Sequence, residues 1–176
     1  LRLERDGERI VGKKIGVTSK PVQDMLGVFQ PDFGFLTNAM EYPDGASIAI
    51  HDTGGSGRPL VLANGLGGPF ASWRHQVDYL SDRYRIVSWD YRGLYGSTVP
   101  AGDSPRLDVG RHVEDLEAVL ESLGIERAAF IGWSMGVQVI LELYERRPEL
   151  VSHLLLVNGT FGRPLHSTSV PLSSRI

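Results

Sequence analysis

Ala128-Ala129-Phe130-Ile131-Gly132-Trp133-Ser134-Met135-Gly136 is the stretch that decides the fold. It begins as a short apolar run with the length of a buried strand and continues, after Ser134, as a helical pattern that Pro148 ends. A strand that turns so tightly into a helix needs glycines where a β-carbon would clash. Such a turn raises the hydroxyl of Ser134 above the sheet, at the positive end of the helix dipole. Ser134 is therefore the candidate nucleophile, and the backbone N–H of Met135 is a candidate donor to an oxyanion.

Strands and helices alternate around this stretch. We expect strands at 47–51, 59–63, 84–89, 128–132 and 151–157, and helices at 70–80, 109–123 and 135–147. The clearest helix is 109–123, where apolar residues recur every three to four positions and Gly124 follows the end. Strands joined by helices imply parallel βαβ units, and nearly continuous apolar strands fit a sheet covered on both faces. The sequence thus predicts an α/β fold with a mostly parallel sheet and flanking helices.

Composition excludes several classes of protein. The chain has 176 residues, 41% of them hydrophobic, with a net charge of -3 and a pI of about 6.0. That charge gives no reason to expect nucleic acid or an anionic membrane as a partner. There is no cysteine, which excludes disulfides and thiol nucleophiles, and no apolar run approaches the ~20 residues that span a bilayer. The first residues lack the features of a signal peptide, so we expect a cytoplasmic protein. Because the chain does not begin with Met, we expect a fragment or a processed product.

A glycine-rich loop follows the predicted strand at 59–63. It reads Asn64-Gly65-Leu66-Gly67-Gly68. In α/β folds with a nucleophile on a tight strand-to-helix turn, the second oxyanion donor lies in such a loop. The backbone N–H of Leu66 is the second candidate donor. The loop lacks both the Gly-x-x-x-x-Gly-Lys and the Gly-x-Gly-x-x-Gly pattern, so nucleotide binding is not expected and no cofactor is predicted.

Three stretches resemble the α/β-hydrolase superfamily in wording, order and spacing: Leu60-Val61-Leu62-Ala63-Asn64-Gly65-Leu66-Gly67-Gly68, Trp89-Asp90-Tyr91-Arg92-Gly93-Leu94-Tyr95-Gly96-Ser97 and Gly132-Trp133-Ser134-Met135-Gly136. The resemblance covers residues 44–165. It implies that Ser134 is a nucleophile and that Asp90 and Arg92 order a turn, with Asp90 only a weak catalytic candidate. The chain departs from the family at Asn64, where a histidine is usual. The departure is mild, because the oxyanion donor at this loop is a backbone group.

A serine nucleophile needs a base and an orienting acid, and in this fold they follow the serine in the order acid, then histidine. No aspartate follows Ser134, and a position that carries the acid in some family members is Asn158. The later glutamates lie on the next helix or in its closing turn, namely Glu142, Glu145 and Glu149. Of the histidines, only His166 could reach Ser134; those that could not are His51, His75, His112 and His153. We therefore expect a partial fold, truncated before its last strands, and a catalytically incomplete chain.

Residues 11–43 resemble a different family, the 2-keto-4-pentenoate hydratases related to fumarylacetoacetate hydrolases. The resemblance lies in Val11-Gly12-Lys13-Lys14-Ile15-Gly16-Val17-Thr18-Ser19-Lys20, Met25-Leu26-Gly27-Val28 and Gln30-Pro31-Asp32-Phe33-Gly34. That family binds a divalent metal through acidic residues beyond this stretch, and Glu4, Glu8 and Glu41 form no credible cluster, so no metal site is expected. We predict a loosely structured leader (1–43), a partial hydrolase domain (44–165) and a flexible tail (166–176), which makes the chain a chimera.

Three functions remain open. The first is a serine hydrolase that cleaves an ester or a carbon–carbon bond of a small apolar ester or ketone. The second is a non-catalytic fragment that binds a small ligand or a partner protein, and the third is a hydratase remnant. Both resembled families serve the degradation of aromatic ring-cleavage products. A truncated sheet also leaves its last strand with an open edge, so oligomerisation through that edge is expected.

Overall fold

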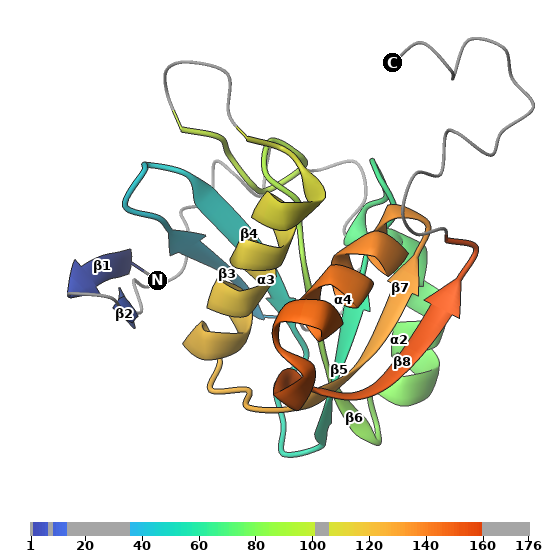
Figure 1. The fold of residues 1–176 in the computed structure, drawn as a ribbon. Coiled ribbons are helices and arrows are strands. Elements are labelled where there is room, and N and C mark those ends of the chain that lie inside the picture. The colour runs from blue at the N-terminus through green and yellow to red at the C-terminus, as the bar shows by residue number, and fades with distance from the viewer. Residues whose placement is uncertain (1, 7–8, 14–35, 101–105, 160–176) are drawn as a thin grey trace, which may run out of the picture.

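The computed structural model describes residues 2–6, 9–13, 36–100 and 106–159, and its strands form one eight-stranded sheet (Figure 1). In chain order the strands are β1 (Arg2–Asp6), β2 (Arg9–Lys13), β3 (Leu36–Glu41), β4 (Ser47–Asp52), β5 (Arg58–Ala63), β6 (Tyr84–Trp89), β7 (Ala128–Trp133) and β8 (Val151–Val157). Their order in space is β2-β1-β3-β4-β6-β5-β7-β8. Neighbours from β6 to β8 are parallel, whereas β4 is antiparallel to both β3 and β6. The predicted α/β fold with a mostly parallel sheet is confirmed.

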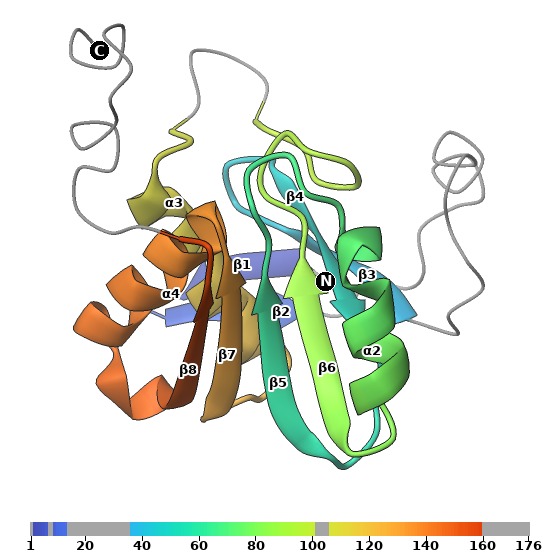
Figure 2. The ribbon, with the colours of Figure 1, turned by 90° about the vertical axis from the view of Figure 1, so that its right-hand side faces the viewer.

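Helices cover both faces of the sheet (Figure 2). One face carries α3 (Val109–Ser122) and α4 (Met135–Arg146), and the other carries the 3₁₀ turn η1 (Phe70–Trp73) with α2 (Arg74–Leu80). A second 3₁₀ turn, η2 (Pro148–Leu150), joins α4 to β8. Alternate residues of β5 enter different clusters: Val61 packs in the larger one with α3 and α4, and Leu62 packs in the smaller one with α2. Burial on both faces explains why the central strands are continuously apolar.

The sheet also includes three strands, β1, β2 and β3, that begin in the segment predicted as a loose leader. β3 pairs with β4 along its whole length, and Met40 is fully buried in the core. The turn between them closes by a hydrogen bond from the N–H of Gly45 to the carbonyl of Tyr42 at 2.9 Å, with Gly45 at φ 85°. The division of the chain near residue 43 stays a prediction. Residues 14–35, which carry most of the hydratase resemblance, and the tail 166–176 lie outside the described residues.

β8 is the last strand on one side of the described sheet. It pairs with β7, and no described strand pairs with its other edge. Leu155 is 56% exposed and Leu156 is 48% exposed. Successive side chains of a strand point to opposite faces, so each face of this edge exposes a leucine. Within the described residues, no helix is long and apolar enough to cross a membrane.

Candidate active site

Ser134 lies between the end of β7 and the first residue of α4, at φ 53° and ψ -116°. Such a backbone conformation costs a residue with a β-carbon about 1–3 kcal/mol, so neighbouring contacts must hold it. The N–H of Ser134 donates to the carbonyl of Val157 on β8 at 3.0 Å, and its carbonyl accepts from the N–H of Val137 at 3.1 Å. The residue is exposed to solvent. The turn therefore presents a hydroxyl at the N-terminus of α4, where free N–H groups and the helix dipole favour negative charge.

The glycines on either side of Ser134 are required by close packing. A β-carbon on Gly136 would lie 2.1 Å from the carbonyl oxygen of Ala63 on β5. A β-carbon on Gly132 would lie 2.7 Å from both the carbonyl oxygen of Gly136 and the Cδ1 of Ile140. The first contact is with backbone in the middle of the sheet, which has no room to move. The steric reason that the sequence predicted for both glycines is confirmed.

The glycine-rich loop 64–68 passes directly beside the nucleophile. A β-carbon on Gly65 would lie 3.3 Å from the Cβ of Ser134 and 3.0 Å from the ring of Trp133. The loop closes on itself through a hydrogen bond from the N–H of Gly68 to the carbonyl of Gly65 at 3.0 Å. The side chain of Leu66 is 75% exposed. The loop that carries the second candidate donor thus adjoins the serine, while the donor roles of Leu66 and Met135 stay predictions.

Asn64, which stands where the family usually has histidine, anchors the start of this loop. Its Oδ1 accepts from the Nε1 of Trp73 at 2.6 Å, and its Nδ2 donates to the carbonyl of Trp89 at 3.2 Å. Its own carbonyl accepts from the hydroxyl of Tyr91 at 2.7 Å. Burial raises the pKa of Tyr91, which keeps this hydroxyl protonated as a donor. The buried amide thus joins the loop to η1, to β6 and to the turn after β6.

Asp90, the first residue after β6, orders the turn that follows it. Its Oδ2 accepts from the N–H of Gly96 at 3.1 Å, and its carbonyl accepts from the hydroxyl of Ser97 at 2.7 Å. The Oδ1 lies 3.1 Å from the Nε2 of His51, whose ring stacks on Phe70 with centroids 4.6 Å apart. With both carboxylate oxygens occupied, Asp90 has the structural contacts that the sequence predicted. The partnership with His51 on β4 was not predicted.

Arg92 ties the same turn to α3 and to the β3–β4 hairpin. Its side chain is 2% exposed, and its Nε lies 2.8 and 3.0 Å from the two carboxylate oxygens of Asp115, which is fully buried. Its Nη1 donates to Asp44 at 3.0 Å, and its guanidinium lies 4.5 Å from the centre of the Tyr42 ring. Burial raises the pKa of Asp115, and the hydrogen bond from Arg92 opposes that rise. These contacts stabilise the turn after β6 and do not involve Ser134.

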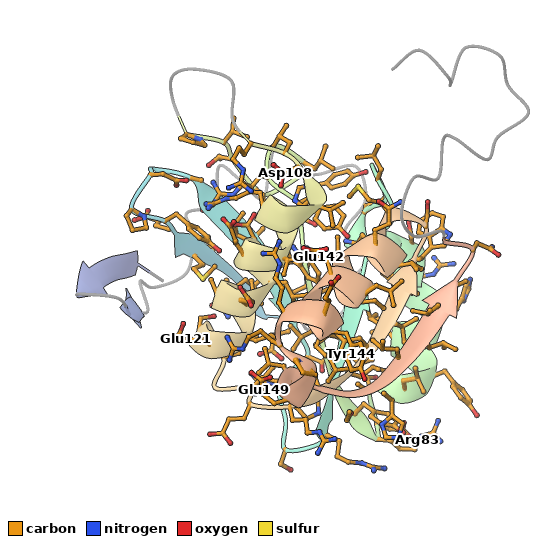
Figure 3. All side chains as sticks on the ribbon, in the orientation of Figure 1. Arg83, Asp108, Glu121, Glu142, Tyr144 and Glu149 are labelled. Carbon is orange, nitrogen blue, oxygen red and sulfur yellow. The ribbon has the colours of Figure 1, made fainter. Side chains whose placement is uncertain are left out.

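The glutamates after Ser134 do not reach it. Glu142 pairs with Arg146 at 2.7 Å, Glu145 is exposed, and Glu149 pairs with Arg147. Figure 3 shows Glu149 at the end of α4 opposite the turn that carries Ser134.

The histidines within the described residues do not reach Ser134 either. His75 and His153 are exposed, and His112 is buried against Tyr91. His166 lies outside the described residues. Across 36–100 and 106–159, no side chain forms a hydrogen bond to the Ser134 hydroxyl, and no three His, Asp or Glu residues are grouped as metal ligands would be.

Comparisons with known proteins agree with this geometry. The family model described as alpha/beta hydrolase fold matches residues 58–173. A relative in Agrobacterium fabrum, described as a carbamate hydrolase and named RutD, is 32% identical over 110 residues, which are 61% of this chain and 41% of that protein. The crystal structure of a hydrolase from Pseudomonas aeruginosa superposes with a TM-score of 0.66 at 30% identity, over 74% of this chain and 49% of that one.

The second resemblance is also confirmed. A 2-hydroxyhexa-2,4-dienoate hydratase from Comamonas testosteroni is 69% identical over 55 residues. The matched part is 31% of this chain and 21% of the hydratase. The chain therefore spans a fifth of this hydratase and less than half of the hydrolases that it resembles.

Proposed function

This chain belongs to the alpha/beta hydrolase fold family, and from that premise we propose that Ser134 is the nucleophile of a serine hydrolase. The proposed reaction is attack on the carbonyl carbon of a small apolar ester or ketone, with cleavage of a carbon–oxygen or carbon–carbon bond. The observation that carries the proposal is the exposed Ser134 at φ 53°, at the start of α4 and beside the loop 64–68. The proposed location is the cytoplasm.

The role assigned to each group follows from the negative charge that develops on the substrate during the reaction. When the Ser134 oxygen attacks, the substrate carbonyl oxygen becomes negative and needs hydrogen-bond donors already in place. We assign this role to the backbone N–H groups of Met135 and Leu66, aided by the dipole of α4. A base must also accept the serine proton, and no described side chain is hydrogen-bonded to this hydroxyl. We therefore propose slow turnover by this chain, since oxyanion donors and binding alone leave only a residual rate.

A fluorophosphonate probe tests the nucleophile directly. We expect slow labelling at Ser134, mapped by mass spectrometry, and complete loss of that label in Ser134→Ala. Ser81→Ala is the matched control, because Ser81 is also exposed but lies at the end of α2, and its labelling pattern should equal that of the parent. Ester hydrolysis should stay far below that of an ordinary esterase. Rapid turnover that Ser134→Ala abolishes would refute the slow-turnover proposal.

A non-catalytic binding fragment is the second candidate. The observation that favours it is the lack of a hydrogen-bonded base at Ser134 among the described residues. The same probe separates the two functions, because phosphonylation requires a reactive hydroxyl whereas ligand binding does not. Absence of any label on the folded chain would leave the binding fragment as the better description.

A hydratase function has less support. The hydratase relative matches only 55 residues, and the described residues hold no cluster that could ligate a divalent metal. We propose that the shared segment does not form a working hydratase site, because a segment of this size cannot bury a core by itself.

The edge of β8 with which no described strand pairs is the proposed route of self-association. Leu155 and Leu156 are both about half exposed, and the strand carries no Lys, Arg, Asp or Glu that would discourage pairing. Leu155→Lys should weaken association by roughly tenfold, since burial of one leucine contributes about 1.5 kcal/mol. Sedimentation velocity over a concentration series measures this, with Tyr79→Lys on α2 as a control at another exposed site. A parent chain that stays monomeric at every concentration contradicts the proposal.

A further inference from the structure

Tyr95 combines two features that its sequence context does not explain. It lies in the turn after β6 at φ 49°, a conformation that residues with a β-carbon rarely adopt. Its side chain is 48% exposed, yet its hydroxyl donates a hydrogen bond to the carbonyl of Gly67 in the loop beside Ser134. A strained backbone is kept only where other contacts compensate for it. The contact with Gly67 is therefore a candidate for a functional contact of the site around Ser134.

The loop 64–68 has its carbonyl groups engaged at three positions. The carbonyl of Asn64 accepts from Tyr91, that of Gly65 accepts from the N–H of Gly68, and that of Gly67 accepts from Tyr95. This pattern matters because a carbonyl oxygen turned toward a developing oxyanion would repel it. A peptide next to glycine rotates easily, so such a loop needs restraint to keep its N–H groups available.

The two tyrosine contacts differ in their access to water. Tyr91 is buried and holds the start of the loop, where Asn64 is also fixed by its side chain. Tyr95 holds the far end, at Gly67, and water can compete for its half-exposed hydroxyl. The start of the loop is thus anchored in the core, whereas residues 66–68 are held by the hydrogen bond from Gly68 to Gly65 and by Tyr95.

We propose that Tyr95 is a positioning residue that latches the loop 64–68 in the conformation that presents the N–H of Leu66 to a ligand on Ser134. The inference rests on the proposed function, because it assigns Tyr95 to the same oxyanion site. Tyr95 acts through Gly67 and takes no part in bond making. Its loss should therefore slow the chemical step at Ser134 and leave the initial binding of a probe unchanged.

Tyr95→Phe tests the latch, because it removes the hydroxyl and keeps the ring. The first readout is hydrogen exchange at the amides of residues 66–68, which we expect to accelerate by about three- to tenfold, as for one lost hydrogen bond. The second is phosphonylation of Ser134, where the maximal rate constant should fall by a similar factor and the half-saturating probe concentration should not change. Tyr144→Phe is the matched control, since Tyr144 on α4 is 49% exposed, and neither readout should change.

A second variant separates the latch from a purely structural role. Tyr95→Gly removes the strain at φ 49° together with the hydroxyl, so it should keep or raise the melting temperature and still accelerate exchange at 66–68. Unchanged exchange and an unchanged maximal rate in Tyr95→Phe would overturn the inference, as would faster exchange spread over the whole sheet. If the parent chain takes no label at Ser134, the proposed function fails, while exchange at 66–68 still decides whether Tyr95 latches the loop.

Discussion

Gly136→Ala is expected to destabilise the fold by about 3 kcal/mol or more, the upper range for overpacking. The added β-carbon would lie 2.1 Å from the carbonyl oxygen of Ala63 and 2.8 Å from that of Asn64. Both are backbone atoms at the end of a central strand, so α4 must move away from β5. In an ordinary helix the same substitution stabilises by about 1 kcal/mol. The predicted change in stability for Gly136→Ala therefore has the opposite sign to the change that helix propensity alone predicts.

Gly110→Ala supplies the matched control for this prediction. Gly110 is the second residue of α3, as Gly136 is the second residue of α4. The nearest atoms to its added β-carbon would be side-chain ends, the Nη2 of Arg146 at 3.0 Å and the Oδ1 of Asp108 at 3.1 Å, which can shift. Urea unfolding of both variants should show little change for Gly110→Ala. Equal stability of the two variants would mean that the close approach of α4 to β5 is not required.

Breaking the buried ion pair between Arg92 and Asp115 is the second large effect. Removal of Asp115 leaves the buried Arg92 with only the partly exposed Asp44, and removal of Arg92 leaves the buried Asp115 with only Arg111 at 3.6 Å. Each loss should cost about 3–5 kcal/mol. We expect both Arg92→Leu and Asp115→Leu to fall in this range by chemical denaturation. The double variant should lose less than the sum of the two, because no unpaired charge remains. The exposed pair of Arg106 with Asp108 is the control, and Arg106→Leu should leave the free energy of unfolding nearly unchanged.

The two single variants should respond differently to pH. Burial already raises the pKa of Asp115, and without Arg92 only the smaller lowering effects of Arg111 and Tyr42 oppose that rise. A carboxyl whose pKa is higher in the folded than in the unfolded state favours folding most at low pH. Arg92→Leu should therefore recover part of its stability in mildly acidic buffer. Asp115→Leu should not recover in this way, because the stranded guanidinium keeps its charge. Parallel pH profiles for the two variants would contradict this assignment of the charges.

The central strands and the turn at Ser134 could be predicted because their signals are local. Gly132 and Gly136 flank Ser134 in a five-residue pattern, although the atom that excludes a β-carbon at Gly136 belongs to the distant Ala63, and the apolar runs of β5 and β7 indicate burial on both faces. β1, β2 and β3 were not predicted, and for β3 the reason is the lack of a local signal. Its sequence, Leu-Thr-Asn-Ala-Met-Glu, has weak strand propensity, and the strand depends on pairing with β4 and on the burial of Met40.

The contacts that hold the loop beside Ser134 could not be predicted. Tyr91 and Tyr95 lie 27 and 28 residues along the chain from the carbonyls that they bind. The pair of His51 with Asp90 joins residues 39 apart. Hydrogen bonds between such distant residues leave no periodic pattern in a single sequence. The helix expected at 70–80 was correct in position, although its first turn is the 3₁₀ turn η1.

The order of the strands in the sheet has a consequence for folding during synthesis of the chain. After β6, β7 joins the other edge of β5 and β8 joins β7, so the sheet then grows at one side only. The turn at Ser134 is held by Val157 of β8 and by Gly159, which packs against Val137 and the Ser134 carbonyl. During synthesis, the turn at Ser134 therefore gains these contacts only after β8 has emerged from the ribosome. Among the described strands, the outer edge of β8 is unpaired and carries two exposed leucines, which makes it a natural target for chaperones during synthesis.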